Sequence, residues 1–99
     1  MARLELAAPA QADLDRLFEF LAAEDAVAAG ATLSVIFDGL YVLERHPMIG
    51  RPVENNLREL VISRGKSGYE SLYDYFEADD VVLVLALRHQ REAGFPERR

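Results

Sequence analysis

The residues best suited to chemistry lie near the end of the chain, where R-H-Q-R-E at 88–92 follows an apolar run. Arg88, His89 and Arg91 place three potential cations at one end of a predicted strand. In an acidic protein such a group suggests a partner surface. It could also be a solvated strand end, as most charged runs are. The residues alone leave these two interpretations open.

A second pair of cations flanks a predicted hairpin tip. Arg64 and Lys66 lie on either side of Gly65, in a connection that suits a β-hairpin. This tip could simply be exposed, or it could add to the cationic edge. We predict no catalytic residue, because His89 has no acid or nucleophile beside it and a lone histidine is more often structural than catalytic.

The sequence predicts neither a metal site nor a cofactor. It contains no cysteine, so disulfides and thiolate metal sites are excluded, and His46 and His89 are isolated from each other. Residues 1–14 contain one basic side chain and no long apolar run, so we expect neither a signal peptide nor a membrane span. We therefore expect one cytoplasmic domain over residues 1–99.

The chain is acidic, with 17 acidic and 11 basic side chains and a net charge of −6. Residues 1–56 hold four basic and nine acidic side chains, whereas residues 57–99 hold seven and eight. Proteins that bind nucleic-acid backbones usually concentrate Lys and Arg, because binding releases counterions. We therefore expect no direct, sequence-specific nucleic-acid binding.

Two amphipathic helices are predicted after a short strand at 3–7. The first begins near Pro9 and should end near Glu24. The second must stop at His46, because a following proline disfavours the α conformation. Gly30 would cost about 1 kcal/mol relative to alanine, so this helix should start late or make a close helix contact there. The apolar stripes of the two helices are Leu14, Leu17, Phe18, Leu21 and Leu33, Ile36, Phe37, Leu40, Leu43.

Three strand-like runs, at 57–62, 69–76 and 81–87, follow a turn-rich loop at 47–56. The third is apolar on both faces, which predicts a central strand covered on each side. The fold class is therefore α+β, in the order β-α-α-β-β-β, with a helical hairpin packed on a small, mainly antiparallel sheet. In the second run, one face is expected to pack on the helices rather than stack on bases: Tyr69, Ser71, Tyr73 and Tyr75.

Three charged residues are predicted to hold the loop and the strand after it. Arg51 lies between Gly50 and Pro52, and we expect its guanidinium to tie the loop to a carboxylate or to backbone carbonyls. Arg58 and Glu59 begin a strand on opposite faces, so each should pair across strands rather than with the other.

Three stretches of the chain resemble a family of toxins: P-M-I-G-R-P at 47–52, R-E-L-V-I at 58–62 and L-A-L-R-H-Q-R-E-A-G-F at 85–95. The first two patterns recur across the RelE/ParE superfamily, and the R-H-Q-R-E-A-G-[YF] ending is more particular to its ParE branch. The resemblance spans essentially the whole chain and includes the element order. It implies the toxin of a type II toxin–antitoxin system, a non-enzyme that inhibits DNA gyrase and is neutralised by direct binding of a ParD-like antitoxin.

These two implied partners divide the candidate residues between them. Gyrase is expected to contact the cationic group Arg64, Lys66, Arg88, His89 and Arg91. The antitoxin is expected to fill an apolar groove along the helical hairpin, in a hetero-oligomeric complex. Its expected contacts are Leu14, Leu17, Phe18, Leu21, Ile36, Phe37 and Leu40.

The alternative within the superfamily is a RelE-like, ribosome-dependent mRNA endonuclease, which needs a general base, a general acid and cations around the phosphate. Here Glu70 follows Gly68-Tyr69, where the ribonuclease branch commonly has arginine, and Phe95 stands where it tends to have tyrosine. Phenylalanine cannot exchange a proton. A third alternative is an inert binding module that keeps the toxin fold and has lost its target.

Overall fold

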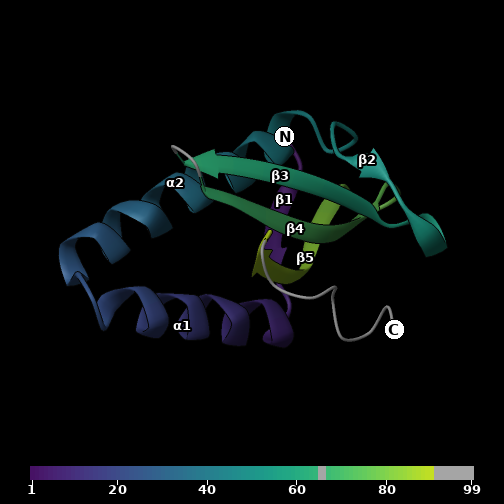
Figure 1. Cartoon of the computed structure of the whole chain (residues 1–99). Helices are drawn as coiled ribbons and strands as arrows, with labels where there is room; N and C mark the ends of the chain where they lie inside the picture. The colour runs from purple at the N-terminus through teal and green to yellow at the C-terminus, as the bar shows by residue number, and fades with distance from the viewer. Residues whose placement is uncertain (65–66, 91–99) are drawn as a thin grey trace.

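The computed structural model describes residues 1–64 and 67–90 (Figure 1). The predicted order of strands and helices is confirmed, and two short elements lie in the segment that was expected to be only a loop. The elements are β1 (Arg3–Leu6), α1 (Ala8–Ala22), α2 (Ala26–Arg45), β2 (Arg51–Pro52), the 3-10 helix η1 (Glu54–Asn56), β3 (Arg58–Arg64), β4 (Ser67–Phe76) and β5 (Val81–His89).

The five strands form one mixed sheet in the order β1-β5-β4-β3-β2. β1 runs parallel to β5, and the other neighbours are antiparallel, so the expected hairpins at β3–β4 and β4–β5 are confirmed. β1 pairs with β5 only as far as Val84. Farther along this edge the backbone amide of Leu87 donates to the Asp13 carboxylate of α1 at 2.9 Å, so a side chain takes the place of a strand neighbour.

Both helices cover the same face of the sheet, and they diverge from their connection at the left of Figure 1. Proline lies in the first turn of α1, as predicted. Asp25 caps α2 by accepting a hydrogen bond from the Ala28 amide at 3.0 Å, and α2 ends before His46, also as predicted.

The expectation for Gly30 was wrong in both of its forms. α2 begins at Ala26, ahead of Gly30, and a Cβ built at Gly30 would meet nothing within 4 Å. The close contact lies instead at Gly39, where a Cβ would be 2.7 Å from the Ile62 side chain of β3. Helix and sheet therefore touch where the second glycine of α2 lies.

The core lies between the helical hairpin and the sheet. Tyr69 and Tyr73 belong to it and Tyr75 packs against it, so the expectation that this face of β4 packs on the helices is confirmed. By length and composition alone α2 could cross a membrane, with mean hydropathy 1.7 and 28% of that stretch buried. Its fully buried residues Ile36 and Leu40 pack in this core, which favours a core helix.

A bulge interrupts the pairing of β4 with β5. Leu72 lies opposite Ala86 and Tyr73 lies opposite Val84, so Leu85 is the extra residue. A bulge of one residue shifts the alternation of side chains between the two faces of a strand. Leu87 and His89 therefore lie on the helix side of the sheet, and Arg88 lies on the opposite side.

The described residues cover the opposite side of β5 only in part, so the prediction of a strand buried on both faces holds for one face fully and for the other face partly. Val53 and Leu57, on either side of η1, pack against Leu72 and Ala86 there. Leu83 is only half-buried. The sheet thus has one face covered by helices and a second face covered by a short segment over its middle strands.

The expected roles of Arg51 and Glu59 are confirmed, whereas Arg58 binds the loop rather than a neighbouring strand. Arg51 pairs with the Glu59 carboxylate at 2.7 Å, joining β2 to β3. Arg58 instead donates to the carbonyl oxygens of Met48 and Gly50, at 2.9 and 2.8 Å. Arg58 and Glu59 thus use different partners, as their opposite faces predicted.

Candidate partner-binding site

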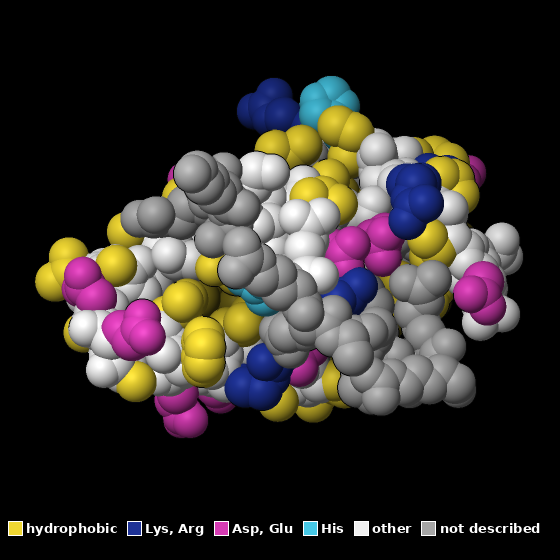
Figure 2. Space-filling view, in the orientation of Figure 1, with side chains coloured by type: hydrophobic (Ala, Val, Ile, Leu, Met, Phe, Trp, Pro, Cys, Tyr) yellow, Lys and Arg dark blue, Asp and Glu magenta, His cyan; other side chains and the backbone are white. Residues whose placement is uncertain are grey.

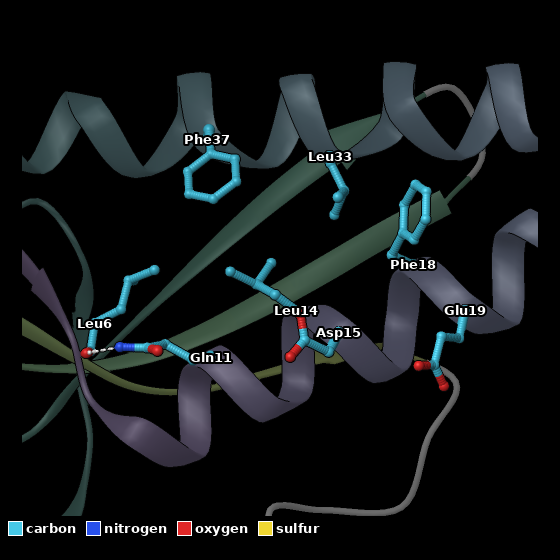
Figure 3. A pocket seen from close by; sticks show the side chains of 8 residues that line it. All are labelled: Leu6, Gln11, Leu14, Asp15, Phe18, Glu19, Leu33 and Phe37. Atoms are coloured by element: carbon cyan, nitrogen blue, oxygen red, sulfur yellow. Dashed lines mark hydrogen bonds between the residues drawn. The ribbon is translucent and has the colours of Figure 1, made fainter.

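A groove of about 590 Å³ lies between the two helices (Figure 3). Its apolar walls come from both helices, because Leu14 and Phe18 of α1 face Leu33 and Phe37 of α2. Each pair is spaced four residues apart, which places its members on one face of their helix. The remaining lining residues are Leu6, Gln11, Asp15 and Glu19.

Leu6, at the end of β1, lies at one end of the groove. Gln11 donates from its side-chain amide to the Leu6 carbonyl oxygen at 3.0 Å, a contact drawn in Figure 3. Leu6 is the last residue of β1, so this bond joins the end of the strand to the first part of α1. This end of the groove is therefore attached to the edge strand of the sheet.

Only some of the residues predicted to meet the antitoxin line this groove. Leu14, Phe18 and Phe37 do so. Leu17, Ile36 and Leu40 are 3%, 0% and 0% exposed because they are packed in the core, so their inclusion in the predicted surface needs correction. Leu21 is half-buried and is not a lining residue.

The sequence interpretation missed five lining residues: Leu6, Gln11, Asp15, Glu19 and Leu33. The apolar stripe of a helix identifies the face that meets the core, whereas a groove between two helices is lined by the flank of each stripe. The missed signal is the polar row Gln11, Asp15 and Glu19, which repeats every four residues beside Leu14 and Phe18.

The cationic residues at the end of β5 do not form one cluster. Arg88 forms an ion pair with Glu70, its opposite residue in β4, and these side chains are 15% and 14% exposed. His89 packs edge-on against Tyr69, with ring centroids 5.1 Å apart, on the other side of the sheet. Adjacent residues of a strand alternate between its two faces, which accounts for this separation, and the bulge at Leu85 sets which face each residue occupies.

The other predicted target-binding residues are only partly placed. Arg64 is the last residue of β3. Lys66, Arg91 and Phe95 lie outside the described residues. In residues 1–64 and 67–90, no three His, Asp or Glu side chains are placed to hold a metal ion.

A second hollow, of about 620 Å³, lies beside the loop that follows α2. Tyr75 of β4 and Glu77 line one side of it, and Met48 and Ile49 of the loop line the other. Burial raises the pKa of the neighbouring Tyr73 hydroxyl, while the hydrogen bond from Gly50 and the charge of Arg58 lower it. This tyrosine therefore stays protonated at neutral pH and acts as a structural hydrogen-bonding group.

Comparisons with known proteins agree with this architecture. The chain matches the family model described as the ParE toxin of the type II toxin–antitoxin system, parDE, over residues 4–94. It is 32% identical over 92 residues to Toxin RelE3 of Caulobacter vibrioides, covering 93% of this chain and 98% of the relative.

Solved structures show the same fold at lower sequence identity. The chromosomal ParDE toxin–antitoxin system of P. aeruginosa gives a TM-score of 0.76 at 18% identity, covering 90% of this chain and 96% of the other. The intact RelBE toxin–antitoxin complex of E. coli gives 0.59 at 16% identity, covering 94% and 100%. The RelBE2 complex of Mycobacterium tuberculosis gives 0.60 at 18%, covering 92% and 93%. Because the family model matches nearly the whole chain, the chain belongs to the ParE toxin family of the RelE/ParE superfamily.

Proposed function

We propose that this type II toxin acts by inhibiting DNA gyrase, without catalysis of its own, in the cytoplasm. A ParD-like antitoxin neutralises it by filling the groove between α1 and α2. The gyrase-facing surface lies around the C-terminal end of β5. Its proposed contacts are Arg64, Lys66 and Arg91, together with either Arg88 or His89, which lie on opposite faces of the sheet.

The pairing of Arg88 with Glu70 is the observation that carries the choice against RNA cleavage. A carboxylate beside a guanidinium cancels much of its field. A carboxylate about 4 Å from a phosphate also repels it by about 1 kcal/mol in water and about 4 kcal/mol at an effective dielectric of 20. RNA cleavage requires cations free to stabilise the charge that develops around phosphorus. Contact with a protein target makes no such demand.

The apolar groove supports the antitoxin as its occupant. Leu33 and Phe37 are only half-buried against the core, and Phe18 is 37% exposed, so a partner could bury all three further. Burial of apolar area is the main favourable term in most protein association. The similar ParDE and RelBE structures are toxin–antitoxin systems, which supports a partner of this kind.

The second candidate function is ribosome-dependent cleavage of mRNA. It is favoured by the 32% identity to a protein named Toxin RelE3 and by the likeness to RelBE complexes. The two functions differ in target, so one pair of assays distinguishes them.

The test compares the purified chain with its antitoxin complex in two reactions. We expect the free chain to inhibit supercoiling by gyrase and the complex to be inactive. Primer extension on translating mRNA should give no toxin-dependent stops. Discrete new stops would establish the ribonuclease alternative. The inert binding module would be indicated by three results together. The chain would bind its antitoxin, show neither gyrase inhibition nor mRNA cleavage, and leave growth unchanged when induced alone.

A further inference from the structure

Among the described residues, the charged side chains that line the groove are all acidic and all belong to α1. Asp15 and Glu19 of α1 are exposed lining residues, whereas α2 contributes only Leu33 and Phe37. Arg16, the basic residue of α1, pairs with Asp13 at 3.8 Å. Within the described part of the chain, neither Asp15 nor Glu19 has an ion-pair partner. One flank of the groove is therefore acidic.

The helical hairpin as a whole carries most of the net charge of the protein. Residues 8–45 contain seven acidic and two basic side chains, a net charge of −5, compared with −6 for the whole chain. In Figure 2, apolar and acidic side chains lie together over the hairpin at the left of the view, beside a hollow. A partner that approaches this side meets a negative potential before it meets the apolar walls.

We propose that the antitoxin segment in the groove is amphipathic and basic, with apolar side chains between α1 and α2 and Lys or Arg along the flank that faces Asp15 and Glu19. This inference rests on the proposed antitoxin role of the groove and specifies the chemistry of its occupant. An acidic segment of equal apolar content would be repelled by the same flank.

The spacing of the two carboxylates supports a role in orienting the segment. Asp15 and Glu19 are four residues apart in α1, which places their Cβ atoms about 5–6 Å from each other on one face. Both carboxylates lie on the α1 side of the groove, and the α2 residues that line it are apolar. Only cations on the side of the occupant that faces α1 could therefore reach the carboxylates. Charge complementarity at an interface rim mainly raises the association rate and fixes register.

The test uses the chain and the antitoxin encoded beside it. The variant Asp15→Asn with Glu19→Gln removes both rim charges with little change of shape. The control Asp74→Asn with Asp79→Asn removes the same net charge from two residues that do not line the groove. Association rate and Kd are measured by surface plasmon resonance at about 50 and about 300 mM salt, where screening lengths differ markedly.

We expect the rim variant to weaken binding about three- to tenfold at the lower salt, mainly through slower association, and to reduce the salt dependence. The control should change Kd less than about twofold. Equal Kd values for the rim variant and the control, or tighter binding by the rim variant, would overturn the inference.

A second pair of variants separates this inference from the proposed function. Phe18→Ala removes an apolar wall residue, whereas Phe20→Ala removes a 74% exposed phenylalanine of the same helix that does not line the groove. We expect only Phe18→Ala to weaken binding, by about tenfold or more. If it does and the rim variant does not, the groove is the antitoxin site but its occupant is not basic. If neither Phe18→Ala nor the rim variant weakens binding, the groove assignment itself fails.

Discussion

The hydroxyl group of Tyr73 accepts a hydrogen bond from the backbone amide of Gly50 at 2.9 Å, which joins β4 to the loop after α2. A Cβ at Gly50 would lie 2.6 Å from that oxygen, so only glycine permits this approach. Arg58 binds the carbonyl oxygens of Met48 and Gly50 in the same loop. The P-M-I-G-R-P stretch is thus fixed to the sheet by Tyr73 of β4 and by two residues of β3, Arg58 and the Glu59 that pairs with Arg51.

Tyr73→Phe should destabilise the fold by about 1–3 kcal/mol, because it leaves the buried Gly50 amide without its acceptor. The matched control is Tyr75→Phe, which removes a hydroxyl that binds Asp80 at 2.7 Å in an exposed position. The control should change the free energy of unfolding by less than about 0.5 kcal/mol. Urea denaturation measures both, and equal losses would show that the Gly50 bond has no special role.

The same tyrosine should make the protein less stable in alkali. Burial raises the pKa of Tyr73 above its ordinary value of 10.0. Because the folded pKa is the higher one, this stabilising contribution is complete below pH 10 and is lost as pH rises above it. Unfolding free energy measured from pH 9 to 11 should fall more steeply for the wild type than for Tyr73→Phe. Parallel curves for the two proteins would contradict this assignment.

The two glycines of α2 should respond in opposite ways to alanine. At Gly39 the new Cβ would meet the β-branched Ile62 side chain at 2.7 Å, and such overpacking typically costs about 1–3 kcal/mol. At Gly30 the Cβ would meet nothing within 4 Å, so alanine should stabilise the helix by about 0.5–1 kcal/mol. Thermal melting of both variants tests this, and a stabilising Gly39→Ala would show that α2 can shift away from β3.

These examples show which features of the fold could be predicted from the sequence. Helix ends follow from local chemistry, and so the stop before His46 was predicted correctly. The alternating tyrosines of β4 identified the face that packs on the helices. The tight glycine was assigned to the wrong position because contact between α2 and β3 depends on how the two pack, which periodicity does not encode.

The candidate site was less predictable than the fold for a related physical reason. The run of charged residues suggested one cluster, but adjacent residues of a strand alternate between its faces, so Arg88 and His89 lie on opposite sides of the sheet. The bulge at Leu85 sets which side each of them occupies. For the groove, the apolar stripes predicted Leu17, Ile36 and Leu40 as contacts, but these residues are buried in the core. The stripes did not predict the polar lining residues Gln11, Asp15 and Glu19.

The ion pair between Arg88 and Glu70 should show strong coupling. Both side chains are largely buried, so Glu70→Gln alone should destabilise the fold by up to about 3–5 kcal/mol, since it removes a buried counter-charge of Arg88. The double variant Glu70→Gln with Arg88→Met should cost less than the sum of the single changes. A double-mutant cycle in urea measures this, and additive effects would mean that the two residues act independently.

The last prediction separates toxicity from neutralisation. Lys66→Ala with Arg91→Ala removes two predicted gyrase contacts. We expect this variant to melt like the wild type, to bind antitoxin with unchanged Kd and to arrest growth less, because rim charges contribute to target association. Phe18→Ala should do the reverse, since it lines the groove: it should remain toxic and need more antitoxin for rescue.

Growth after induction is scored with and without the antitoxin gene, which distinguishes lost toxicity from lost neutralisation. A gyrase supercoiling assay then tests whether the change in growth reflects a change in gyrase inhibition. If the Lys66 and Arg91 variant arrests growth fully while stable, the gyrase-facing surface lies elsewhere on the molecule. If Phe18→Ala loses toxicity but keeps its stability and its antitoxin affinity, the target rather than the antitoxin occupies the groove. The first result would move the gyrase-facing surface and the second would exchange the two surfaces, and both would leave the family assignment intact.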